Sequence, residues 1–200
     1  MSPELHSWFL ERAAPVSAVL ARDLAAVGPV RFPEREDHGA AAFLARAVIG
    51  QQISAAAARG IWSRIEAAAS HRGVTLREYL LAADAAALRG HGLSANKAKA
   101  VLGINAADAA GDLAALHGID HATRSERLCR IWGIGQWTCD MLGIFYCRDE
   151  DVWPEGDLAV QRTFRTYIGR RKPSSAAAQF TPYRSLLALY LWRIASAQWK

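Results

Sequence analysis

Alanine is the feature of this sequence that most restricts the folds available to it. It contributes 40 of the 200 residues, and no residue has a higher intrinsic helix propensity. Runs in which β-branched and polar residues alternate strictly, as they do in half-buried strands, are nearly absent. Since 52% of the residues are hydrophobic, the chain also has enough apolar material for a core. The sequence therefore predicts an all-α protein that folds alone.

Membrane, secreted and metal-cluster proteins are all disfavoured by the residue pattern. No apolar run reaches the roughly 18 to 20 residues that span a bilayer, and the N-terminal segment has no signal-peptide pattern. The three cysteines, Cys129, Cys139 and Cys147, form no CxxC pair, which argues against a disulfide framework, a zinc site or an iron–sulfur cluster. We expect no membrane partner and a reducing cytoplasm.

The charge balance is compatible with a polyanionic partner but does not require one. The formal net charge is +5, and 20 of the 24 basic residues are arginine. Arginine suits bidentate contacts to phosphate, although an ordinary basic surface or a GC-rich coding bias would give the same composition. Charge alone therefore does not separate a nucleic-acid-binding protein from other basic proteins.

Hydrophobic periodicity and capping residues divide the chain into helices joined by short connections. Asp37 is a start signal for the first predicted helix, and Ser94 is the expected N-cap of a later one. There is no internal repeat and no low-complexity linker. A further helical stripe follows residue 133, at Ile134, Trp137, Met141 and Phe145. The other predicted helices cover residues 40–48, 53–70, 75–81, 84–89, 95–109, 124–131, 158–169 and 182–197.

The motif Gly133-Ile134-Gly135 lies between two of the predicted helices. Two glycines around one apolar residue allow a hairpin too tight for side chains, with amide N–H groups facing outward at the start of the second helix. Such amides, reinforced by the helix dipole, bind a phosphate oxygen. The alternative is an ordinary corner between two helices in which the glycines permit close packing.

Three segments together resemble the helix-hairpin-helix DNA glycosylase superfamily. Its motif ends with an aspartate some twenty residues beyond the hairpin, and here Asp157 lies 22 residues after Gly135. Residues 41–62 resemble the helix-GQQ-S segment of the AlkA-type 3-methyladenine DNA glycosylase II, and residues 88–104 resemble its G-x-S-x-x-K-A segment. With residues 181–192 the resemblance covers nearly all of 40–195.

The resemblance implies a two-lobed helical bundle that forms a single glycosylase domain over residues 1–200, with the helix-hairpin-helix at about 124–146. Larger members carry an additional N-terminal β-rich domain, so this chain resembles a minimal form. The hairpin has Trp132 where such motifs usually have proline.

The implied reaction is hydrolysis of the N-glycosidic bond of a damaged base in base excision repair. Cleavage develops positive charge at C1′ of the deoxyribose, which a carboxylate can stabilise while it orients the attacking water. The resemblance gives this role to Asp157, although an aspartate directly before a helix is equally an N-cap. An alkylated purine is already cationic and needs no proton donor to leave. The expected substrates are 3-methyladenine and, beyond it, 7-methylguanine or hypoxanthine.

A cationic base is held well by aromatic side chains. By resemblance, Trp137 and Trp192 match pocket tryptophans, and Met141 stands where related enzymes can have an aromatic residue, although tryptophan at helical spacing often fills a core. Enzymes that also cut the strand use a lysine two residues after the hairpin. That position is Trp137, and no lysine occurs from 100 to 171, so we expect a monofunctional enzyme without lyase activity.

A flipped-out base leaves a gap in the duplex that the enzyme must fill. Gln51-Gln52-Ile53 resembles the family's wedge segment, with Gln52 in the gap and Ile53 supporting it. The alternative is that Gln51 caps a helix and Ile53 is core. Backbone carbonyls of Cys129, Ile131 and Ile134 would hold a monovalent cation beside the phosphate, and no other cofactor is expected. The implied DNA-binding residues are Gln51, Gln52, Ile53, Ser94, Lys97, Lys99, Gly133, Ile134 and Gly135.

The expected partner is double-stranded DNA that contains damaged bases, bound by a monomer associated with the nucleoid. One alternative is the same fold acting on deaminated or oxidised bases, which requires an acid group in the pocket. Another is a DNA-binding module without catalysis, in which Asp157 is only a cap. A third is a helical protein-interaction domain, whose affinity for DNA would hardly depend on salt.

Overall fold

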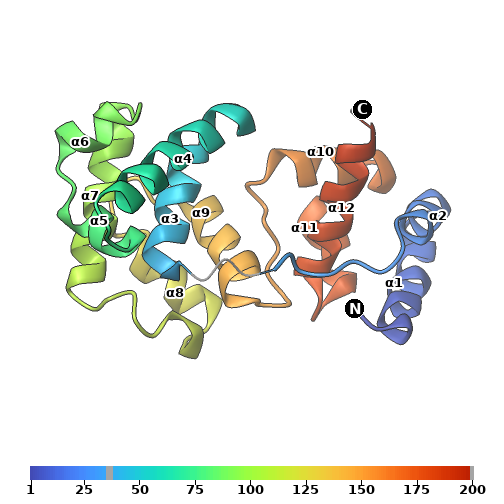
Figure 1. Ribbon diagram of the computed structural model, residues 1–200. Helices are drawn as coiled ribbons and strands as arrows, with labels where there is room; N and C mark the ends of the chain where they lie inside the picture. Colours follow the sequence, from blue (N-terminus) through green and yellow to red (C-terminus); the bar gives the residue numbers. More distant parts are fainter. Residues whose placement is uncertain (35–37, 199–200) are drawn as a thin grey trace. The chain divides into compact units, whose positions relative to one another are not determined.

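The computed structural model describes residues 1–34 and 38–198 (Figure 1). Every regular element in these two ranges is a helix, which confirms the all-α prediction. None of their helices is both long and apolar enough to cross a membrane. Asp37, the predicted start signal, lies outside the described residues.

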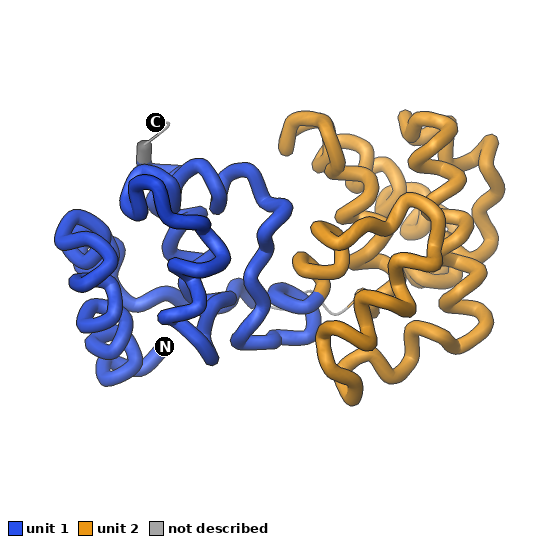
Figure 2. Tube along the Cα trace, turned by 180° about the vertical axis from the view of Figure 1, so that it is seen from behind, with its two compact units in different colours: residues 1–34, 143–200 blue, residues 35–142 orange. Residues whose placement is uncertain are grey.

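The chain forms two compact units (Figure 2). Met1–Glu34 and Gly143–Lys200 make the first unit, and Arg35–Leu142 makes the second. Each unit has its own apolar core. The chain therefore begins in the first unit, builds the whole of the second, and returns to complete the first.

The first unit packs its helices around fully buried aromatic and aliphatic residues such as Phe9, Leu24, Phe164 and Tyr190. Ser2 caps α1, and Ser17 caps α2, each by accepting a backbone N–H. The helices of this unit are α1 (Pro3–Val16), α2 (Ala18–Val27), α10 (Leu158–Ile168), α11 (Pro173–Ala177) and α12 (Arg184–Gln198).

The second unit has a core built from α3, α4, α5 and α7, with Ile49, Trp62, Ile65 and Leu80 among its buried residues. Its helices are α3 (Gly39–Gly50), α4 (Ala55–His71), α5 (Leu76–Ala82), α6 (Ala85–Gly90), α7 (Ala95–Ala109), α8 (His121–Leu128) and α9 (Gln136–Met141).

The last predicted helix starts at Arg184 and not at residue 182. The starts of two other helices also differ from the prediction, and side-chain caps explain both of these. α4 begins at Ala55 and not at residue 53, because the Ser54 hydroxyl accepts from Ala57 N at 3.2 Å. α8 covers 121–128 and not 124–131, because Asp120 accepts from Thr123 N at 3.0 Å. The predicted Ser94 cap of α7 is confirmed, since its Oγ accepts from Lys97 N.

Candidate active site and nucleic-acid interface

The hairpin after α8 is a tight turn that requires glycine at its third position, Gly133. The Ile134 amide donates to the Ile131 carbonyl at 3.1 Å, and Gly133 has φ +88°, which is the pattern of a type II turn. A Cβ at Gly133 would lie 2.6 Å from the Cβ of Ala100 on α7. The turn is therefore pressed against α7 and has no room for a side chain.

Gly135 directly precedes α9 and, unlike Gly133, has open space around it. It is the N-cap of α9, with no side-chain hydrogen bond to the first turn, and a Cβ there would meet nothing within 4 Å. The first amides of a helix point away from it along the axis. The backbone at Gly135 is thus accessible to an anion, as phosphate binding requires.

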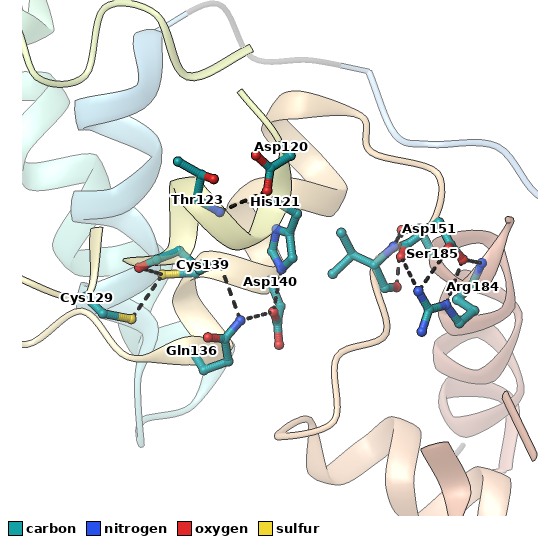
Figure 3. A network of polar contacts seen from close by, with 12 residues as sticks. Asp120, His121, Thr123, Cys129, Gln136, Cys139, Asp140, Asp151, Arg184 and Ser185 are labelled. Carbon is teal, nitrogen blue, oxygen red and sulfur yellow. Dashed lines mark hydrogen bonds and ion pairs between the residues drawn. The ribbon is translucent and has the colours of Figure 1, made fainter. Parts of the chain in front are cut away.

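Polar contacts join α8 to α9 behind the hairpin (Figure 3). The buried Asp140 carboxylate accepts from Gln136 Nε2 at 2.8 Å and lies 3.0 Å from His121 Nε2. The Cys129 and Cys139 sulfurs are 3.6 Å apart, and burial together with this contact raises the pKa of Cys139 to about 12. These contacts hold the second helix of the motif in register with the first.

No group of His, Cys, Asp or Glu side chains within the described ranges is arranged to hold a metal ion. The predicted cation site is made of backbone carbonyls instead. One of them, Ile131, already accepts the Ile134 amide in the turn, although a carbonyl has a second lone pair. Cation binding by Cys129, Ile131 and Ile134 stays a prediction.

The Gln51-Gln52-Ile53 segment is held firmly at its first residue. Lys97 Nζ donates to the carbonyls of Ile49 and Gln51, both at 2.8 Å, and Gln51 Nε2 donates to Thr138 Oγ1 at 3.1 Å. Burial lowers the pKa of Lys97. The lysine predicted to grip a phosphate therefore binds the C-terminal carbonyls of α3, and its role toward DNA stays a prediction.

The two residues after this anchor are exposed. Gln52 has φ +56°, a conformation that costs a non-glycine residue energy, and Ile53 is 38% exposed. The alternative in which Ile53 belongs to the core is therefore wrong. Both residues are thus exposed beside the anchor at Gln51, and their role as a wedge stays a prediction.

Asp157 lies in the first unit, where its carboxylate is buried and fixed. Its Oδ1 accepts from Val160 N at 2.9 Å, which makes it the N-cap of α10, and from Trp192 Nε1 at 3.1 Å. Only 8% of the residue is exposed. Both expected features are thus present in one side chain: the cap, and contact with a predicted pocket tryptophan.

The Asp157 loop is itself anchored to α12. Arg184 forms a two-pronged ion pair with Asp151, at 2.7 and 2.8 Å (Figure 3), and this partner raises the pKa of the guanidinium. Ser185 Oγ accepts from Val152 N and donates to its carbonyl. The loop before Asp157 therefore has a fixed path, and Arg184 has a structural role.

Trp192 packs against Phe145, with ring centroids 5.3 Å apart. Both rings line a cavity of about 1000 Å³ in the first unit, together with Arg31, Asp23 and Leu189. The other predicted pocket residues, Trp137 and Met141, lie one helical turn apart on α9 in the second unit. Met141 is buried and Trp137 is half-buried.

Comparison with known proteins identifies the family of this chain. The chain is 30% identical over 161 residues to DNA-3-methyladenine glycosylase 1 of Schizosaccharomyces pombe, a match that covers 75% of this chain and 70% of the relative. It belongs to the DNA-3-methyladenine glycosylase family. No protein-family model matches the sequence.

Solved structures of family members agree with the fold. The S. pombe 3-methyladenine DNA glycosylase in complex with abasic DNA superposes with a TM-score of 0.78 at 27% identity, over 93% of this chain and 97% of that one. A DNA-3-methyladenine glycosidase from Bacillus halodurans has the same score and identity over 97% of this chain and 89% of its own. The segment predicted at about 124–146 as a helix-hairpin-helix corresponds to α8, the turn after it and α9, and its role as the motif of one glycosylase domain stays a prediction.

Proposed function

We propose that this member of the glycosylase family hydrolyses the N-glycosidic bond of alkylated bases in double-stranded DNA, with 3-methyladenine as the main substrate. The observation that carries the proposal is the fixed carboxylate of Asp157, held by a backbone amide and by the indole of Trp192. Family membership supports the reaction, and the second unit supplies a hairpin suited to a phosphate.

The chemistry follows from where charge develops. As the bond between C1′ and the base nitrogen breaks, its electron pair moves to the base, and a cationic alkylated base leaves as a neutral molecule. Positive charge remains at C1′, where a preorganised carboxylate stabilises it. Water attacks C1′ and gives a proton to Asp157, which leaves an abasic site.

The site residues divide into two tasks. We assign Asp157 to the reaction and Trp192, Trp137 and Met141 to holding the base, since electron-rich rings attract a cationic purine. We assign the hairpin amides of Gly133, Ile134 and Gly135, the Gln51-Gln52-Ile53 segment and the start of α7 (Ser94, Lys97, Lys99) to DNA. Because position 137 is tryptophan and not lysine, the enzyme forms no Schiff base and leaves the strand intact.

We further propose that the two units act as one glycosylase domain at the nucleoid. The support is the path of the chain, which leaves the first unit after Glu34 and re-enters it at Gly143. The second unit is therefore a continuous segment inserted between the two parts of the first.

The experiment is release of free base from duplex DNA treated with a methylating agent, with untreated duplex as the control. We expect 3-methyladenine in the chromatogram and strands that stay whole until the abasic sites are cleaved by alkali. Release of uracil or of an oxidised base, with alkylated bases left in place, would mean that the substrates are deaminated or oxidised bases and not alkylated ones. Duplex binding without release of any base would make the protein a non-catalytic module.

A further inference from the structure

Trp132 is exposed at the tip of the hairpin, where the turn itself does not need a tryptophan. Its exposed fraction is 48%, unusual for so large an apolar side chain. It occupies the second position of the type II turn whose third position is Gly133. Proline is favoured there because its fixed φ suits the turn, and most other residues are accepted. The indole ring therefore calls for a role beyond the turn.

A lysine ammonium group lies over the ring of Trp132. Lys99 Nζ lies 4.5 Å from the centroid of the indole, a distance at which an ammonium is attracted to the face of the ring. The neighbouring contact between Gly133 and Ala100 presses the hairpin against α7 one residue further along. Two adjacent contacts thus fix the position of Lys99 relative to the hairpin.

We propose that Trp132 is a positioning residue that holds the ammonium of Lys99 beside the hairpin, so that the DNA phosphate bound by the hairpin amides is also neutralised by Lys99. The inference rests on the proposed function, because it takes the phosphate to belong to duplex DNA. It explains why an exposed tryptophan lies next to the most tightly packed glycine of the motif.

The physical reason lies in the flexibility of lysine. A free lysine side chain loses much rotamer freedom when it contacts a phosphate, and a ring that already restrains it removes part of that cost. An amide donor and an ammonium on one phosphate also differ in their response to salt. The ammonium releases a counterion when it binds, whereas a neutral amide does not.

The test measures binding to a duplex that carries a stable abasic-site analogue, by fluorescence anisotropy over a series of salt concentrations. The variants are Lys99→Gln, Trp132→Pro, Trp132→Tyr and the double variant Lys99→Gln with Trp132→Pro. Arg12→Gln is the matched control, because it removes one positive charge that lies over another tryptophan, Trp8, in the first unit.

We expect Lys99→Gln to weaken binding about tenfold at low salt and to reduce the slope of log K against log salt by about 0.9, the value for one phosphate contact. Trp132→Pro keeps the turn and should weaken binding about threefold, which is less than the loss expected for Lys99→Gln. The double variant should bind no more weakly than Lys99→Gln alone. Trp132→Tyr keeps an aromatic face and should restore most of the loss.

Three results would overturn the proposal. Wild-type affinity in Trp132→Pro would make the tryptophan a turn residue only. Additive losses in the double variant would mean that the ring contacts DNA by itself. An unchanged salt slope in Lys99→Gln, equal to that of Arg12→Gln, would remove the lysine from the phosphate site. If urea unfolding shows that Trp132→Pro is unstable, Trp132→Gln, which the turn also accepts, makes the same comparison.

The proposed function is tested separately by base release from methylated duplex with protein in saturating excess. If wild type releases base but the Trp132 and Lys99 substitutions have additive effects on duplex binding, only the positioning role is overturned. Coupled variants in a protein that releases no base would support the positioning role and refute the glycosylase reaction.

Discussion

Gly133 and Gly135 are two residues apart, but the structure gives them different constraints. Gly133 has φ +88° and faces Ala100 at a distance that no Cβ tolerates, whereas Gly135 has φ −111° and open space around it. The first glycine should therefore be needed for folding of the hairpin, and the second for the approach of a ligand.

Substituting each glycine by alanine separates these roles. Gly133→Ala should lower the free energy of unfolding by at least about 2 kcal/mol, from the left-handed backbone and the clash. Gly135→Ala should change it by less than about 1 kcal/mol but weaken DNA binding, because its methyl group would lie where we propose that a phosphate binds. Urea unfolding and duplex binding of both variants check this, and equal stability of the two would contradict it.

At the scale of helices, the boundaries that sequence patterns place correctly are those with an N-cap next to an apolar stripe. Ser94 before α7 is such a case. The start of α4 is misplaced because Ile53 fits the apolar stripe of the helix and yet stays in the turn before Ser54, exposed. Periodicity cannot tell a core residue from an apolar residue kept at the surface for function.

Two features of the helices have no local signal in the sequence. α9 passes directly into the π-helix Leu142–Cys147, which depends on tertiary packing. Arg124 of α8 is buried and donates to the carbonyls of Leu116 and Ile119, although arginine is almost never buried without partners. Both result from long-range or loop contacts that a pattern of residue types does not encode.

Two substitutions should distinguish the residue that anchors the loop between α3 and α4, Lys97, from the proposed wedge residue, Ile53. Lys97→Met keeps the length of the side chain but leaves the Ile49 and Gln51 carbonyls without their donor, which should cost about 1 to 3 kcal/mol of stability. Ile53→Ala removes an exposed side chain and should change stability by no more than about 0.5 kcal/mol.

Ile53→Ala, which should hardly change stability, should change the rate of base release. Ile53→Ala should slow base release from a lesion in a normal pair more than from one in a mismatch, because a mispaired base costs less to flip. Single-turnover rates on the two duplexes measure this ratio. Equal slowing on both would show that Ile53 does not assist flipping.

At the scale of the whole molecule, the sequence predicts the fold class and the chemistry better than it predicts which helices pack into the same core. Asp157, Trp192 and the hairpin glycines are recognisable in the sequence. The division into two cores is not, because α1 and α2 pack with α10 and α12 from the other end of the chain. Nor is the Arg184 clamp on the Asp157 loop, whose two partners lie 33 residues apart.

The core of the first unit contains two tyrosines whose hydroxyl groups stay protonated to higher pH in the folded state than in the unfolded chain. Burial raises the pKa of Tyr190 to about 12, and burial with a hydrogen bond to Asp23 does the same for Tyr167. Above the ordinary tyrosine value the unfolded chain loses protons that the folded chain keeps, so stability must fall as pH rises from about 10 toward 12.

Urea unfolding at pH 8, 9, 10 and 11 tests this. We expect no tyrosine-linked change between pH 8 and 9, and above pH 10 a loss approaching about 1 kcal/mol per pH unit for each buried tyrosine. Tyr167→Phe, which keeps the ring, should reduce the slope. A slope that Tyr167→Phe leaves unchanged would contradict the assignment to Tyr167.

The measurement that tests the account most directly is single-turnover release of 3-methyladenine by wild type and Asp157→Asn. Asparagine keeps an Oδ1 that can accept from Val160 N and Trp192 Nε1, and it caps a helix as well as aspartate does. Unfolding curves should therefore be nearly the same.

The negative charge is lost in this variant, so the rate should fall by at least about a hundredfold if the carboxylate stabilises charge at C1′. A matched unfolding curve with that loss of rate is the predicted result. An Asp157→Asn protein that releases 3-methyladenine at the wild-type rate would show that Asp157 is only a helix cap and would contradict the mechanism.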